Sequence, residues 1–168
     1  MTHASEKVET KVVEIGKFEV KSGFIKISDP CYEPGIWCTA NVKAKNGVWN
    51  AYTTTGVFSG WGKRVIELFA VHEEFEGKNR DIMYLIPADI GVDSGQCGLF
   101  DNDQYHGVAG HDGWYETCRN VSAGDGGAIH GGVISSSGFG DGGYRAFVTK
   151  DGDDAVAVKV VFIVEEDD

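Results

Sequence analysis

Three short segments of the chain place an aspartate in a turn beside small residues, next to a predicted strand end. They are residues 28–32, 92–96 and 137–144. Each of Asp29, Asp93 and Asp141 could hold its own turn, because an aspartate carboxylate accepts hydrogen bonds from backbone N–H groups two residues further on. If the three turns share one end of a β structure, the carboxylates would instead form one acidic pocket.

Such an acidic pocket would suit a hard cation, because calcium and magnesium are bound by oxygen ligands. The candidate metal ligands are Asp29, Asp93, Asp101 and Asp141. Residues 101–103 begin like an EF-hand loop, but Tyr105 takes the third ligand position and Asp112 replaces the closing glutamate. The sequence therefore predicts no cofactor with certainty, and calcium or magnesium is the ion that a composite site would take.

Histidine and cysteine residues offer weaker alternatives. His106 and His111 lie in a loop rich in glycine and aspartate, so they are either transition-metal ligands or ordinary polar surface. Cys31 would be a nucleophile if a histidine activated it, but no partner can be named from the sequence. The four cysteines form no C-x-x-C pair, and buried free thiols are the simplest interpretation.

In these segments the chain resembles an uncharacterised bacterial family, a domain of unknown function. The first shared block runs from Gly23-Phe24-Ile25 to Asp29-Pro30, and the second is Asp93-Ser94-Gly95 followed by Asp101. The third is a G-W-G-D-G-x-Y block before a terminal hydrophobic strand, here residues 138–144 with phenylalanine in place of tryptophan. The resemblance spans about residues 17–164 and implies a shared β fold, but it supplies no activity.

Alternating apolar and polar residues between turn signals predict many short strands. We expect strands at residues 17–21, 24–28, 36–44, 48–55, 64–72, 82–86, 128–136, 144–149 and 155–165, and a short one within 88–100. Asn46-Gly47 predicts a hairpin between the third and fourth strands, and the charged loop 73–81 predicts another between 64–72 and 82–86. One short helix is expected at 113–120, and the nearly continuous apolar run 155–165 should be a central buried strand.

Composition agrees with this pattern. The 168 residues include 24 glycines, roughly twice the usual share, which favours many tight turns. We therefore predict an all-β or β-rich α+β fold, an antiparallel sandwich or barrel with one short helix. A single domain should span residues 12–165, and residues 1–11 and 166–168 should be flexible tails.

The net charge of −11 makes the chain strongly acidic. A surface of this sign repels phosphate backbones and anionic lipids, so we expect neither nucleic acid nor membranes as partners. Residues 1–11 carry no hydrophobic stretch of the kind found in signal peptides, which favours a soluble, cytoplasmic protein.

The leading functional hypothesis is a non-catalytic binding module for a small polar ligand or a protein partner. Its candidate ligand-binding residues are Asp29, Tyr32, Asp93, Ser94, Gln96, Asp141 and Tyr144. One alternative is a hydrolase that uses the same carboxylates with a divalent cation. The other is a structural or interaction protein without a pocket, in which each aspartate only holds its own turn. An enzyme is the less favoured class.

Overall fold

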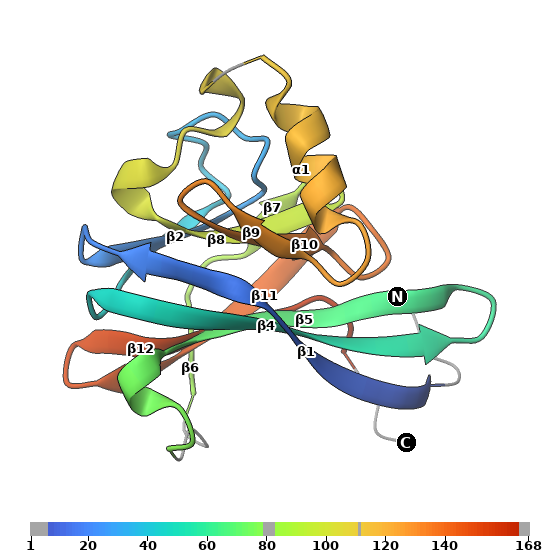
Figure 1. The fold of residues 1–168 in the computed structure, drawn as a ribbon, viewed down its shortest axis with the longest axis horizontal. Coiled ribbons are helices and arrows are strands. Elements are labelled where there is room, and N and C mark those ends of the chain that lie inside the picture. The colour runs from blue at the N-terminus through green and yellow to red at the C-terminus, as the bar shows by residue number, and fades with distance from the viewer. Residues whose placement is uncertain (1–6, 79–82, 111, 165–168) are drawn as a thin grey trace.

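The computed structural model describes residues 7–78, 83–110 and 112–164, and it shows two antiparallel sheets packed face to face (Figure 1). The larger sheet has the strand order β1 (Lys7–Val20), β4 (Gly47–Phe58), β5 (Gly62–His72), β12 (Asp154–Val161), β11 (Gly142–Asp151) and β6 (Tyr84–Leu85), and β7 (Ile90–Val92) also pairs with β11. The smaller sheet has the order β3 (Ala40–Lys43), β2 (Phe24–Ser28), β8 (Gln96–Asp101), β10 (Gly132–Ser136) and β9 (Gly127–Ile129). Since the described strands form two sheets and no closed barrel, the predicted all-β fold with one short helix is confirmed as a sandwich.

One α-helix, α1 (Trp114–Ser122), covers the outer face of the smaller sheet, where it packs on β9 and β10 (Figure 1). Its buried residues, Trp114, Cys118 and Ser122, are four apart and therefore share one face of the helix. The predicted helix at 113–120 is confirmed, with its end two residues further on. The described residues also form three single-turn 3-10 helices: η1 (Glu73–Phe75), η2 (Asn102–Gln104) and η3 (Gly107–Ala109).

The main core lies between the two sheets. Along β4, Trp49, Ala51 and Thr53 are buried while the residues between them are partly exposed, as the period of two in a strand requires. Ile27 of β2 and Leu99 of β8, both without exposed surface, supply the opposite face of this core. The predicted central position of the last strand is confirmed, because β12 lies between β5 and β11.

Both predicted hairpins are wrong. Asn46-Gly47 separates β3 from β4, but β3 pairs with β2 in one sheet and β4 pairs with β1 and β5 in the other. The turn instead ties the layers together, because Asn46 Oδ1 accepts a hydrogen bond from the Gly23 N–H at 2.7 Å. The second expected hairpin fails because β6 pairs with β11 rather than with β5. In both cases the strands on the two sides of the predicted turn pair with other strands and not with each other.

Some strand limits also differ from the sequence-based expectation. The predicted strand 36–44 is shortened to β3, and 128–136 is divided into β9 and β10 by a tight turn at His130-Gly131. The tail expected at residues 1–11 is partly wrong, because Lys7–Lys11 belong to β1 and pair with β4. Residues 1–6 and 166–168, the remainder of the expected tails, lie outside the described residues, as does residue 165.

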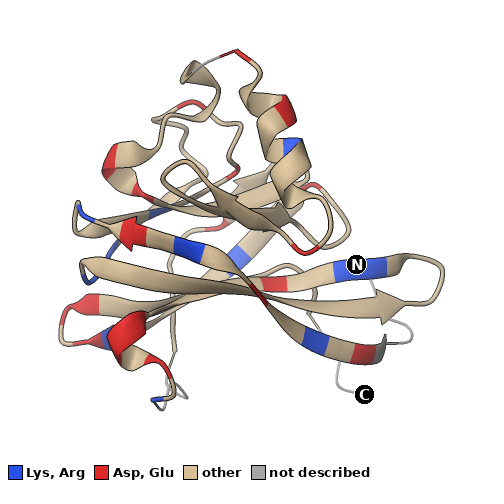
Figure 2. Ribbon diagram, in the orientation of Figure 1, with Lys and Arg blue, Asp and Glu red and all other residues tan. Residues whose placement is uncertain are grey.

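Acidic and basic residues are spread over the strands, loops and helix of both layers (Figure 2). With a net charge of −11, carboxylates outnumber cations across the chain. A local group of cations without carboxylates would therefore depart from the general character of this surface.

Candidate functional site

The carboxylate of Asp29 joins two of the three predicted turns. Asp29 follows β2 and is completely buried. Its Oδ1 accepts the Cys31 N–H at 2.8 Å and the Ser94 hydroxyl at 2.7 Å, and its Oδ2 accepts the N–H groups of Asp93 at 2.9 Å and Ser94 at 2.8 Å. Since both oxygens are occupied by protein donors, Asp29 is a structural cross-link and not an available ligand for a metal or a substrate.

The third turn lies beside the second. The Ser137 N–H donates to the Gly95 carbonyl at 3.0 Å, and Gly142 of β11 pairs with Val92 of β7. The Asp141 carboxylate lies 3.9 Å from the position that a Cβ of Gly95 would occupy. The three turns therefore meet at one end of the sandwich, although Asp29 is enclosed while the side chains of Asp93 and Asp141 face solvent.

Asp101 does not join this group, because it lies at the opposite end of β8 from Gln96. Its oxygens accept the N–H and hydroxyl of Ser22, at 3.1 and 2.6 Å, and the amide of Gln104 at 2.9 Å. Burial raises the pKa of the Asp101 carboxyl, but the hydrogen bonds from Ser22 and Gln104 outweigh it and leave the pKa below its ordinary range. Asp101 therefore anchors the loop after β1.

The four candidate metal ligands are thus divided between two ends of β8. Within the part of the chain that the structure describes, no three His, Cys, Asp or Glu side chains are grouped to hold a metal ion. Of the two histidines considered for a transition metal, His106 packs on the Trp114 ring, and His111 lies outside the described residues. The calcium or magnesium site stays a prediction from the sequence.

The two tyrosines proposed as ligand contacts bond within the protein. The Tyr144 hydroxyl donates to the carbonyl of Gly140 at 2.5 Å and holds the glycine-rich turn. Burial, followed by a hydrogen bond with the Cys38 thiol, raises the pKa of Tyr32 well above its ordinary value. Both phenols therefore act as neutral parts of the scaffold.

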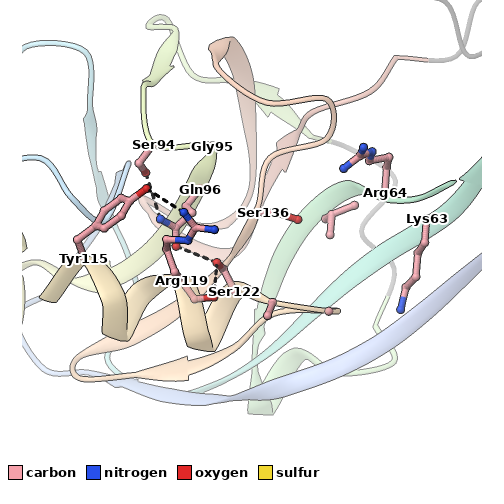
Figure 3. A pocket seen from close by; sticks show the side chains of 12 residues that line it. Lys63, Arg64, Ser94, Gly95, Gln96, Tyr115, Arg119, Ser122 and Ser136 are labelled. Atoms are coloured by element: carbon pink, nitrogen blue, oxygen red, sulfur yellow. Dashed lines mark hydrogen bonds between the residues drawn. The ribbon is translucent and has the colours of Figure 1, made fainter. Parts of the chain in front are cut away.

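Ser94 and Gln96, the other two candidates, line a pocket of about 570 Å³, a size typical of small-molecule sites. The pocket opens between α1, the start of β5 and the second turn (Figure 3). Its lining residues are Lys63, Arg64, Val65, Ser94, Gly95, Gln96, Tyr115, Arg119, Ser122, Ala123, Gly124 and Ser136. We call this the basic pocket, because three of these described residues are cations and none is a carboxylate.

The cations come from two opposite walls of the basic pocket. Arg119 and Tyr115 stand on α1, and Arg64 and Lys63 on β5 (Figure 3). The Arg119 guanidinium lies 5.8 Å from the centre of the Tyr115 ring and donates to its hydroxyl at 3.5 Å. Lys63 forms an ion pair with Asp125 and points away from the centre of the pocket. Among the residues that the structure describes, no carboxylate forms an ion pair with Arg64 or Arg119, so these two carry the positive charge that faces the pocket.

Arg64 has a further polar group to satisfy. Its guanidinium lies 5.9 Å from the centre of the Trp61 ring, which covers one face of the group. Its Nε is buried, and no acceptor for it lies among the residues that the structure describes. A buried donor without an acceptor costs free energy unless a bound molecule supplies the acceptor.

The floor of the basic pocket is formed by the Gln96 side chain. Its Oε1 accepts the Ser122 hydroxyl at 2.8 Å, which fixes the orientation of the amide. Its Nε2 then faces Ser94 Oγ at 3.4 Å and Cys31 Sγ at 4.0 Å. Gln96 thus separates the basic pocket from a pair of thiols behind it.

That pair consists of Cys31, half-buried in the first turn, and Cys118, which has no exposed surface on α1. A hydrogen bond from Cys118 lowers the pKa of the Cys31 thiol. This effect and a hydrogen bond from Ser94 together outweigh burial and the negative charge of Asp29, which both raise the pKa. The hydrogen bond between the two thiols, together with burial, raises the pKa of Cys118. The sequence singled out Cys31 as a nucleophile without a partner, and the structure places a second thiol beside it.

A second cavity of about 960 Å³ lies across the glycine-rich third turn, and we call it the aromatic groove. Trp61 and Phe139, with ring centres 4.7 Å apart, form one wall, and Asp141 and Tyr144 lie on its rim. Trp61, which lies between Gly60 and Gly62 in the turn from β4 to β5, is 50% exposed. Two of the sequence-based candidates therefore belong to this groove and not to the basic pocket.

Sequence reasoning missed Arg64, Arg119 and Cys118. Arg64 and Arg119 are 55 positions apart in the sequence, and neither belongs to a local motif. Only the packing of α1 beside the second turn brings them to one cavity.

Comparison with known proteins found no matching family model, no matching curated protein and no matching solved structure. The resemblance to the domain-of-unknown-function family stays a prediction. No helix among the described residues is long and apolar enough to cross a membrane.

Proposed function

We propose that the chain is a non-catalytic binding module for a small anion that carries a carboxylate or phosphate group. The observation that supports this most directly is the basic pocket, where Arg64 and Arg119 face one cavity in a protein of net charge −11. A guanidinium presents its N–H donors in a planar fork that matches carboxylate and phosphate oxygens. Two arginines on opposite walls can hold the two ends of such an anion.

The remaining lining groups suit the same ligand. The Ser136 hydroxyl can donate to an oxygen of the ligand, and the exposed face of Tyr115 offers a flat apolar surface. The buried Nε of Arg64 would gain its acceptor from a bound anion. These features support recognition of a compact polar molecule more than that of a protein surface.

The hydrolase alternative finds less support at this pocket. Among the lining residues that the structure describes there is no carboxylate and no imidazole, so no ordinary general base faces the cavity. Asp29, which the hydrolase hypothesis required, is enclosed by four protein donors. We therefore propose binding without catalysis.

The test is a thermal-shift series with pyrophosphate, inorganic phosphate and citrate, and with glucose and spermidine as neutral and cationic controls. A ligand that binds only the folded state raises the melting temperature. We expect at least one multivalent anion to raise it by several degrees, and glucose and spermidine to leave it unchanged. Citrate and the phosphates distinguish a carboxylate ligand from a phosphate ligand.

Arginine variants make the test specific to the pocket. Arg119→Gln and Arg64→Gln should each abolish most of the shift, while Arg145→Gln should preserve it. Arg145 is a suitable control because it is exposed, loses the same charge and lines the aromatic groove instead. The absence of a shift with every anion, or equal shifts in all three variants, would overturn the proposal.

A further inference from the structure

The two thiols behind Gln96 carry an inference that is independent of the ligand in the basic pocket. We propose that Cys31 and Cys118 are a redox-active dithiol, in which Cys31 reacts first with a hydroperoxide and Cys118 then closes an intramolecular disulfide. The pair is formed by two segments far apart in the sequence, the turn after β2 and the helix α1.

The structure holds these two segments firmly against each other. The Trp114 indole N–H of α1 donates to the Pro30 carbonyl at 2.7 Å, next to Cys31 in the chain. The Cys31 N–H donates to the Asp29 carboxylate at 2.8 Å, which fixes the backbone of the turn. Cys118 is one helical turn after Trp114, so its thiol faces the same turn as the indole. Both cysteines pack in one small core beneath α1.

The surroundings of the two sulfurs differ in a way that assigns their order of reaction. Cys31 is partly exposed, and the Gln96 amide lies 4.0 Å from its sulfur, where it can stabilise negative charge. The hydrogen bond from Cys118 lowers the pKa of Cys31, so the thiolate that attacks a peroxide forms at the accessible sulfur. Cys118 is enclosed and its pKa is raised, as suits a thiol that acts second.

The chemistry balances with a hydroperoxide as the oxidant. The Cys31 thiolate attacks one peroxide oxygen, so an S–O bond forms, the O–O bond breaks and the leaving oxygen is protonated to water or an alcohol. The Cys118 sulfur then attacks the Cys31 sulfenic acid, the S–O bond breaks and water leaves with the Cys118 proton. The two thiols lose two electrons in total, and the peroxide gains them.

The other two cysteines are separated from this chemistry by their contacts. Cys97 is completely buried on β8, and burial raises the pKa of its thiol. Cys38 is half-buried like Cys31, but its thiol bonds with the Tyr32 hydroxyl. Because Cys38 matches Cys31 in exposure, Cys38→Ser is the natural control variant.

The experiment treats the reduced full chain with hydrogen peroxide and follows it by intact mass and by peptide mapping without reduction. We expect the chain to lose the mass of two hydrogen atoms and to yield one linked peptide that contains Cys31 and Cys118. Cys38→Ser should behave like the wild type. Cys31→Ser should form no disulfide, and its oxidation should be at least about tenfold slower, because the accessible thiolate is gone.

A Cys118→Ala variant tests the order of the steps. It should stop at the Cys31 sulfenic acid, which dimedone captures as a covalent adduct on that residue. If this buried substitution prevents folding, peptide mapping of the wild type still decides the pairing. A disulfide between Cys31 and Cys38, or a Cys31→Ser chain that oxidises as fast as the wild type, would overturn the proposal.

Discussion

Ser94 donates both its backbone N–H and its hydroxyl to the single carboxylate of Asp29, at 2.8 and 2.7 Å. Water does not compete for the oxygens of the Asp29 carboxylate, because Asp29 has no accessible surface. This relationship turns a residue that looked like a ligand into a cross-link between two turns.

Asp29→Asn should strongly destabilise the fold. The amide nitrogen of asparagine would face N–H and O–H donors that now bond to a carboxylate oxygen. Buried donors without an acceptor cost free energy. We expect a loss of about 3 kcal/mol in the free energy of unfolding, measured by urea denaturation. The matched control, Asp93→Asn, removes an exposed carboxylate and should cost less than about 0.5 kcal/mol. Equal effects in the two variants would contradict the cross-link.

The lowered pKa of Asp101 predicts how the stability of the fold changes with pH. Its pKa is lower in the folded chain than in the unfolded chain, so the ionised carboxylate stabilises the fold above about pH 4. This stabilisation is lost as the pH falls through the lowered value. Asp101→Asn should therefore be less stable than the wild type at neutral pH, and the difference should shrink below about pH 4. A difference that stays constant down to acid unfolding would refute the assignment.

Cys31 should react with iodoacetamide at a lower pH than an ordinary thiol. The hydrogen bond from Cys118 lowers the pKa of Cys31, so the thiolate fraction rises earlier in a pH series. In Cys118→Ala this bond is gone, and the midpoint of the rate profile should move to higher pH. Mass spectrometry of the labelled Cys31 peptide measures both profiles, and coincident midpoints would count against the thiol pair.

Gly47→Ala should destabilise the fold at the start of β4. Gly47 has a φ of 132°, and a Cβ there would lie 2.5 Å from Nε2 of His72. Gly152→Ala is the matched control, since Gly152 has a φ of 64° with nothing within 4 Å of its added Cβ. We expect the control to cost about 1 kcal/mol and Gly47→Ala about 2 kcal/mol more, by thermal or urea unfolding. Equal costs would mean that the His72 side chain moves aside without loss of stability, and they would contradict this prediction.

The local pattern of the chain predicted its strands better than their partners. Alternation along β4 was readable because Trp49 and Ala51 must face one side, whatever the strand pairs with. The hairpin at Asn46-Gly47 was wrong because that turn connects the two layers, and the choice is made by residues as distant as Gly23. Pairing over long range leaves no signal in a short sequence window.

The candidate site was likewise predicted only in part from the sequence. The turns at Asp29, Asp93 and Asp141 do meet, as the sequence-based hypothesis required. What the residues do there was not predictable, because burial decides whether a carboxylate is a ligand or a cross-link. Arg64 and Arg119 carried no signal, since two single cations in a long acidic chain look like ordinary surface.

The Asp29 cross-link has a further consequence for hydrogen exchange. Amides in turns at the end of a sheet ordinarily exchange their protons quickly, because such turns open locally. The N–H groups of Cys31, Asp93 and Ser94 are instead bonded to one enclosed carboxylate. The N–H groups of Asp93 and Ser94 can be released only when the contact between segments 64 and 65 residues apart is broken. We expect these two loop amides to exchange as slowly as the central strands, and so to report the opening of the whole sandwich.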